Sequence, residues 1–194
     1  MRHEIVLEGD AFRLRPVALS DAAFIAGLRS DTKERLRFVH RVDPDPALQE
    51  VWLQEYFNRP GDYYWIVERK HDSRPEGTIS LYNLEEAEQT AEWGRWVLRR
   101  GSLAAPESSL LVYSAAFDLL GLANVYCLTV SANSPVVSFH DNSGAKREAL
   151  LTNYFSIDSQ QFDAVRHRVM HDDFPVLKSR LGHLSAMVAA KMKA

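Results

Sequence analysis

The stretch that decides the fold is residues 92–130, EWGRWVLRRGSLAAPESSLLVYSAAFDLLGLANVYCLTV. Residues 92–100 and 124–130 alternate between apolar and polar side chains, which predicts two strands. Residues 106–120 between them are apolar on nearly every side, which predicts a buried helix, and Gly121 is a natural end for it. Two strands joined by a crossover helix run parallel. The stretch therefore predicts a β-α-β unit.

The flanking sequence extends this unit into the order β-α-α-β-β-β-α-β-α-β-β. We expect an α+β fold with a mixed, mostly antiparallel sheet, formed by a single domain over residues 1–194 with a core at 11–171. Residues 172–194 are expected to be helical in pieces. Further strands are expected at 11–17, 63–70, 78–84, 147–157 and 162–170, and further helices at 20–29, 47–57 and 133–143.

Composition excludes several classes of protein. The formal net charge of -3 argues against bulk binding to nucleic acid. Cys127 is the only cysteine, so the chain has no internal disulfide, and its place in an alternating run predicts a buried structural thiol. No segment approaches the ~18 apolar residues of a membrane span. We expect a cytoplasmic protein that does not bind membranes.

The turn before the buried helix is small and basic. Arg99 and Arg100 precede Gly101, and Pro106 fits the first helical turn because its missing N–H is not needed there. Free N–H groups and the helix dipole make such a corner suitable for a phosphate, and the arginines would add charge-assisted hydrogen bonds. The alternative is a tight turn with solvated arginines. The turn is neither a Walker loop nor a GxGxxG motif.

Nearly the whole chain, from FRLRPVALSDAAFIAGLR (12–29) to FDAVRHRVM (162–170), resembles the GCN5-related N-acetyltransferases, or GNAT family. The most specific parts are residues 92–130 and NSPVVSFHDNSGAKREALL (133–151). They look most like the branch of ribosomal-protein and nucleotide-amino-sugar N-acetyltransferases. The resemblance implies acetyl-CoA as co-substrate and a sheet that splays around a slot for coenzyme A.

By the same resemblance, a family loop Q/R-x-x-G-x-G/A binds the pyrophosphate of coenzyme A through backbone N–H groups. One departure is Leu103, which stands where the family has a glycine. It makes positive φ costly and is expected to weaken binding or shift the loop. The strand before the loop would hold the pantetheine arm and supply an oxyanion donor. The implied cofactor-binding residues are Trp96, Val97, Leu98, Arg100, Gly101, Ser102, Leu103, Ala104, Ala105 and Asn133.

The resemblance also suggests two catalytic residues. Glu92 occupies a position that is often acidic in this branch and could deprotonate the amine, or it is a solvated carboxylate. Many relatives carry a tyrosine acid seven residues after the asparagine that matches Asn133, and this position is His140. An imidazole could protonate the departing thiolate, or His140 could only pack near the cofactor. Asn133 could also cap the helix that follows it.

The acceptor is expected to be a small amine, such as a nucleotide-linked amino sugar, or a protein N-terminus. One or two of six aromatic side chains, which are otherwise expected in the core, could stack on it. Residues 172–194 could cap the sheet or form a homodimer contact. No metal site is expected, since His167 and His171 lie four residues apart where a strand runs into a turn and so are not on one face. The six aromatic residues are Trp52, Tyr56, Phe57, Tyr63, Tyr64 and Trp65.

Two rival functions stay open at this point. The departures at Leu103 and His140 fit a module that binds coenzyme A without turning it over. A general nucleotide-binding α+β domain would instead bind ATP or NAD. Binding of acetyl-CoA, followed by thiol release with amines, separates these functions.

Overall fold

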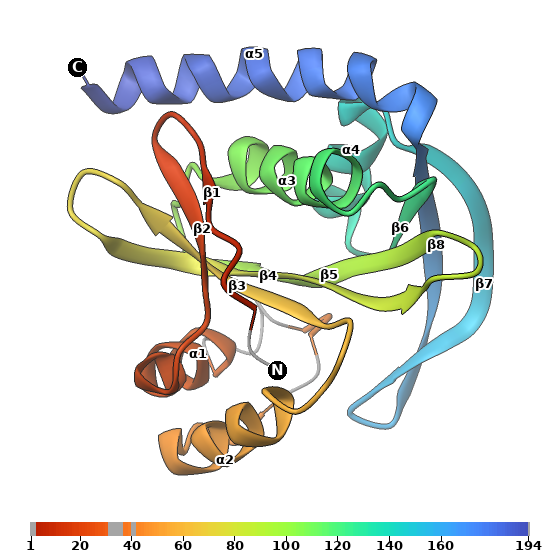
Figure 1. The fold of residues 1–194 in the computed structure, drawn as a ribbon. Coiled ribbons are helices and arrows are strands. Elements are labelled where there is room, and N and C mark those ends of the chain that lie inside the picture. Colours follow the sequence, from red (N-terminus) through yellow and green to blue (C-terminus); the bar gives the residue numbers. More distant parts are fainter. Residues whose placement is uncertain (1–2, 31–36, 40–41, 194) are drawn as a thin grey trace.

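The computed structural model describes residues 3–30, 37–39 and 42–193 and contains one eight-stranded sheet with helices on both faces (Figure 1). Two helices cover one face, α1 (Ala22–Arg29) and α2 (Pro46–Tyr56). Three cover the other, α3 (Ala105–Ser114), α4 (Ser134–Ser143) and α5 (Phe174–Lys193).

The sheet order is β1-β2-β3-β4-β5-β6-β8-β7. The pairing of β5 with β6 is parallel, and the other neighbouring strands are antiparallel. This confirms the predicted α+β fold with a mixed, mostly antiparallel sheet. The strands are β1 (Leu7–Glu8), β2 (Phe12–Pro16), β3 (Tyr63–Arg69), β4 (Arg74–Glu85), β5 (Thr90–Leu98), β6 (Asn124–Val130), β7 (Lys146–Ile157) and β8 (Gln160–Met170).

The two parallel strands separate soon after they meet. Thr90, Ala91 and Glu92 of β5 pair with the first three residues of β6, and the described ladder between the two strands ends there. The later part of β5 pairs only with β4, where Thr78 faces Val97. The sheet therefore splays between β5 and β6, as the resemblance implies.

A β-bulge lies where β5 leaves β6. Between the pairs Thr78–Val97 and Ser80–Gly94, β5 contains one residue more than β4. Arg95 in this bulge has φ +47°, a left-handed conformation that is uncommon for a residue with a Cβ. A bulge bends its strand, so Arg95 marks the point at which β5 turns away.

Each face of the sheet has its own core. The core on the side of α3 and α5 contains Trp65 and Trp93 of the sheet with Phe117 from the turn after α3, and the core on the side of α1 and α2 contains Tyr64 of the sheet with Ile25 of α1. Alternating side chains of one strand supply opposite cores, because successive residues of a strand point to opposite faces. Tyr64 and Trp65 are such a pair.

Some predicted boundaries were wrong. The C-terminal segment is one continuous helix rather than helical pieces, because its buried residues recur every three or four positions: Phe174, Leu177, Leu181, Ser185 and Ala189. Pro175 lies in the first turn, where a proline is tolerated. The helix expected at 106–120 is α3 followed by a π-helical turn, Ala115–Leu119. The short strand β1 was not predicted.

Candidate functional site

A cavity of about 260 Å³ lies where β5 and β6 separate. The later residues of β5 form one wall, residues 127–130 of β6 form the other, and residues from both faces of the sheet reach it. It is therefore open to groups from both layers of helices. Of the predicted site residues, Glu92, Trp96, Val97, Asn133 and His140 line this cavity.

The wall beneath α3 and α4 is aromatic and tightly fixed. The Trp96 indole N–H donates to Ser108 Oγ at 3.1 Å, which ties β5 to α3. The Trp93 indole N–H donates to the Tyr113 hydroxyl at 3.0 Å. Asn133 occupies the N-cap position of α4, but its side chain makes no capping hydrogen bond, contrary to the expected capping role. Asn133 lines the cavity at this wall.

His140, which lies on α4, completes this aromatic wall of the cavity. It is only 2% exposed, and its ring lies 5.2 Å from that of Trp93 and 3.6 Å from Cys127 Sγ. Burial lowers the pKa of His140 to about 3, with a smaller contribution from His167. At neutral pH the ring is therefore an uncharged imidazole. Burial likewise raises the pKa of the Cys127 thiol, in keeping with the predicted structural role.

Acid should destabilise the protein through His140. The unfolded chain takes up the proton near the ordinary pKa, whereas the folded chain resists it until about pH 3, so stability falls as pH drops between these values. We expect His140 to account for a loss of about 2 kcal/mol in the free energy of unfolding between pH 7 and pH 5. Urea titrations of wild type and His140→Gln at both pH values measure it.

The matched control for this comparison is His183→Gln, because His183 is exposed on α5. This control should keep the full pH dependence. An equal pH dependence in wild type and His140→Gln would contradict the assigned burial effect.

The wall on the opposite face presents a carboxylate. Glu92 is the last β5 residue paired to β6, and both of its oxygens accept hydrogen bonds, from the Tyr82 hydroxyl at 2.9 Å and from Asn83 Nδ2 at 3.1 Å. Burial and the neighbouring Glu92 carboxylate raise the pKa of Tyr82, so its phenol stays protonated and donates. Glu92 is thus a fixed carboxylate at the cavity.

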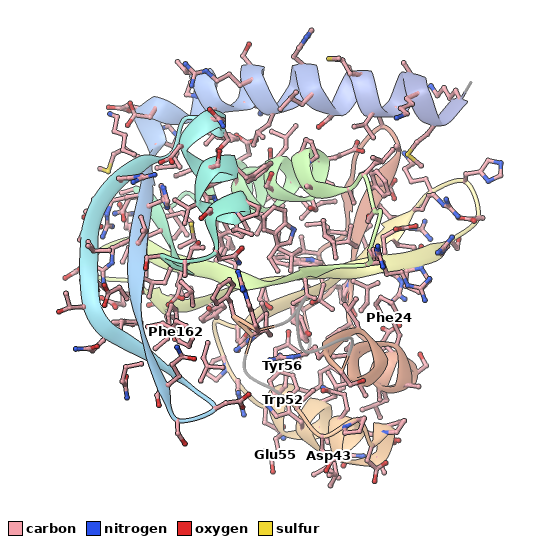
Figure 2. The ribbon with its side chains drawn as sticks, turned by 180° about the vertical axis from the view of Figure 1, so that it is seen from behind. Phe24, Asp43, Trp52, Glu55, Tyr56 and Phe162 are labelled. Carbon is pink, nitrogen blue, oxygen red and sulfur yellow. The ribbon has the colours of Figure 1, made fainter. Side chains whose placement is uncertain are left out.

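Three aromatic residues at this part of the cavity were not among the predicted site residues, although two of them lie in the strands expected at 78–84 and 147–157. Phe38, Tyr82 and Phe155 line the cavity, together with Arg29 and Arg95. The six aromatic residues of which one or two could have stacked on the acceptor do not line this cavity, and they lie in or against the two cores, as the other expectation had it. Figure 2 shows two of them, Trp52 and Tyr56, between α2 and the sheet, where they serve the core.

The loop between β5 and α3 adopts the geometry of a tight turn. Gly101 has φ +77°, and Ser102 N–H donates to the Arg99 carbonyl at 3.1 Å. Leu103 does not have positive φ, so the strain expected there does not arise. Ala104 is the N-cap of α3, whose first N–H groups lack intrahelical acceptors. The predicted loop residues therefore lie together at a helix N-terminus.

A second hollow, of about 500 Å³, lies next to this loop on the side of α1. Arg74, Arg99 and Arg100 give it a positive lining, and Phe24 and Gly27 contribute its apolar part. The Arg99 guanidinium lies 5.4 Å from the centre of the Phe24 ring. Three arginines beside a helix N-terminus make this corner electropositive.

The two histidines four residues apart have separate environments. His167 is buried, with Nε2 3.1 Å from Asp141 Oδ1, whereas the ring of His171 lies against Phe117. Within the described ranges, no three His, Cys, Asp or Glu side chains are grouped so as to hold a metal ion. In the same part of the chain, no helix is both long and apolar enough to cross a membrane.

Known proteins share this architecture. Among solved structures, FdhC, a nucleotide-linked sugar GNAT, is 28% identical with a TM-score of 0.73, and the match covers 89% of this chain and 94% of that one. A GCN5-related N-acetyltransferase from Brucella melitensis is 20% identical with a TM-score of 0.80, covering 91% and 83%. A mutant spermidine N-acetyltransferase SpeG from Vibrio cholerae is 17% identical with a TM-score of 0.74, covering 86% and 97%.

The last two likenesses show the fold alone. No match is found among curated proteins. The family model described as Acetyltransferase (GNAT) domain matches residues 12–146, and it spans the splayed strands, the basic loop and the cavity residues Glu92 and His140. Since this match covers well over half of the chain, the protein belongs to the GNAT acetyltransferase family.

Proposed function

We propose that the protein transfers an acetyl group from acetyl-CoA to a primary amine, by direct attack of the amine on the thioester. The observation that carries this proposal is the cavity at the point where β5 and β6 diverge. On one face of the sheet this cavity holds the Glu92 carboxylate. On the other face it holds Trp96 and Asn133, where acetyl-CoA would bind. An amine and a thioester that enter from opposite faces would meet there.

In this proposal, acetyl-CoA binds to β5 and to the loop that follows it. Backbone N–H groups at the start of α3 would bind the pyrophosphate, and Arg100 would add charge-assisted hydrogen bonds. Trp96, Val97 and Leu98 would hold the pantetheine arm, with the Asn133 amide on the facing wall. A backbone N–H near the bulge would polarise the thioester carbonyl.

Glu92 would accept the proton of the incoming ammonium, directly or through water, because only the neutral amine is a nucleophile. The low pKa of His140 argues against its role as the acid, since a neutral imidazole has no extra proton to give. It favours the other interpretation, in which His140 only packs near the cofactor. A thiol leaving group with an ordinary pKa of about 8.5 departs without a strong acid.

Two acceptor classes remain in the proposal, a small amine and a protein N-terminus. FdhC is a nucleotide-linked sugar GNAT, and SpeG acetylates spermidine, so amino sugars and polyamines are the first amines to test. The cavity of about 260 Å³ is lined by the Glu92 carboxylate and by Phe38, Tyr82 and Phe155 in addition to the two tryptophans, which suits the amine end of such a compound.

Isothermal titration with acetyl-CoA, followed by detection of free thiol with a panel of amines, tests the proposed function. We expect saturable binding of acetyl-CoA and thiol release with at least one amine. Binding without release on any amine would favour a non-catalytic CoA-binding module. Binding of ATP or NAD that coenzyme A does not displace would favour a general nucleotide-binding domain.

The basic loop gives a separate prediction. Arg100 is exposed at the loop, and reversal of its charge would place a repulsive group beside the pyrophosphate. We expect Arg100→Glu to raise the KM for acetyl-CoA about tenfold and to leave kcat within about twofold. The reason is that a contact with the pyrophosphate stabilises the bound substrate and the transition state equally. Steady-state kinetics against acetyl-CoA measures this.

Lys191→Glu is the control for this charge reversal, because Lys191 is an exposed cation near the end of α5. It should leave both constants unchanged. A fall in kcat with unchanged KM in Arg100→Glu would contradict the assignment of the loop.

A further inference from the structure

The conformation of Arg95 is unfavourable by itself. Its φ of +47° brings the Cβ close to the backbone, a cost that glycine does not have. A residue other than glycine keeps such a conformation only where its surroundings impose it. The contacts of Arg95 therefore indicate what imposes the bulge.

Arg95 is held at both its backbone and its side chain. The buried Thr78 hydroxyl donates to the Arg95 carbonyl at 2.8 Å. Its guanidinium donates two parallel hydrogen bonds to Asp62, Nη1 to Oδ1 at 2.6 Å and Nη2 to Oδ2 at 2.9 Å. Asp62 lies in the segment between α2 and β3, and its side chain is only 10% exposed. A bidentate pair of this kind fixes direction as well as distance.

The same guanidinium also reaches the acceptor side. It lies 4.4 Å from the centre of the Tyr82 ring, and the Tyr82 hydroxyl donates to Glu92 at 2.9 Å. A Cβ on Gly94 would lie 2.6 Å from this hydroxyl, so the phenol rests directly on the strand backbone. Asp62, Arg95, Tyr82 and Glu92 thus form a continuous row of contacts along this face of the sheet.

We propose that Arg95, held by Asp62, is a positioning residue for both halves of the site. Its backbone keeps the end of β5 away from β6, which holds the cofactor slot open. Its side chain holds the Tyr82 ring, which orients Glu92 toward the amine. The inference rests on the proposed acetyl transfer, but its backbone half has a test that needs no activity.

Two substitutions separate the two roles. Arg95→Gly removes the side chain but adopts positive φ without cost, whereas Arg95→Ala removes the side chain and keeps that cost. We expect Arg95→Ala to raise the Kd for acetyl-CoA about fivefold, since binding must restore the bulge, and Arg95→Gly to keep it within about twofold. Both should lower kcat about tenfold and shift its pH profile, because Glu92 is no longer oriented.

The control pair is Ser159→Gly and Ser159→Ala. Ser159 also has positive φ, +65°, in the exposed turn between β7 and β8. These variants should leave the Kd, kcat and pH profile of the wild type unchanged.

Crystal structures of the two Arg95 variants supply the readout that does not depend on turnover. A bulge that moves away from position 95 in Arg95→Ala, with the bulge retained at position 95 in Arg95→Gly, supports the proposal. An unchanged bulge in both, or equal Kd values for both, overturns the backbone role. An unchanged kcat pH profile in both overturns the side-chain role. A wild type that binds acetyl-CoA but acetylates no amine refutes the proposed function instead, and the two structures still decide the bulge.

Discussion

Glu92→Gln is expected to lower kcat by about a hundredfold and to leave the KM for acetyl-CoA unchanged. The substitution keeps the size of the side chain and an acceptor for the Tyr82 hydroxyl, which lies 2.9 Å from Glu92. It removes the capacity to take a proton, together with the negative charge and one of the two acceptor oxygens, since Asn83 Nδ2 donates to the second oxygen of Glu92 at 3.1 Å. The loss should therefore fall on the chemical step, which steady-state kinetics at saturating acetyl-CoA measures.

The acceptor supplies a sharper form of this test. An amine whose pKa lies well below the assay pH is already neutral, so it needs no base before attack. We expect the defect of Glu92→Gln to shrink to about tenfold or less with such an amine. An equal defect with amines of high and low pKa would show that Glu92 does not act as the base.

The control for Glu92→Gln is Glu88→Gln, since Glu88 is an exposed carboxylate in the turn between β4 and β5. It tests whether general loss of negative charge near the sheet explains the effect. Its kcat should equal that of the wild type.

Glu107→Ala is expected to reduce the free energy of unfolding by about 4 kcal/mol, because it leaves three backbone N–H groups, one of them buried, without their acceptor. Glu107 is only 2% exposed in the first turn of α3, and its carboxylate accepts from the backbone N–H groups of Asp10, Ala11 and Phe12. A Cβ on Gly9 would collide with this carboxylate. The side chain thus fastens the β1–β2 turn to α3.

Urea titration at neutral pH measures this loss. Glu107→Gln keeps one acceptor oxygen and should lose about half as much. Asp118→Ala removes an exposed carboxylate that pairs with Lys178 and should change the free energy of unfolding by less than about 0.5 kcal/mol. A small effect of Glu107→Ala would mean that water replaces the carboxylate at the turn.

Much of the fold was predictable because its determinants are local. Alternation in residues 124–130 gives β6, and Gly144 ends α4 in the left-handed conformation that glycine favours. The family resemblance, which the family model confirms, then placed the loop after β5 and the cavity residues Glu92 and His140. These positions depend on spacing along the chain, which the sequence displays directly.

The missing parts depend on partners far apart in the sequence. Arg95 in a strand gives no indication of positive φ, since its contact with Asp62 spans 33 residues. The pKa of His140 depends on burial against β6 and β8 rather than on α4 alone. In the sequence, Glu107 looks like an ordinary acidic residue in the first turn of a helix. Its hydrogen bonds to the β1–β2 turn depend on the tertiary fold, which brings that turn to α3.

Because the parallel ladder between β5 and β6 is short, α5 contributes to holding the two halves of the sheet together. Among the described residues, three ladder pairs join the half-sheet of β1–β5 to that of β6–β8. Helix α5 packs on α3, which follows β5, and on α4, which follows β6. Because it contacts the helices that follow both parallel strands, α5 joins the two half-sheets by helix packing, in addition to the ladder hydrogen bonds.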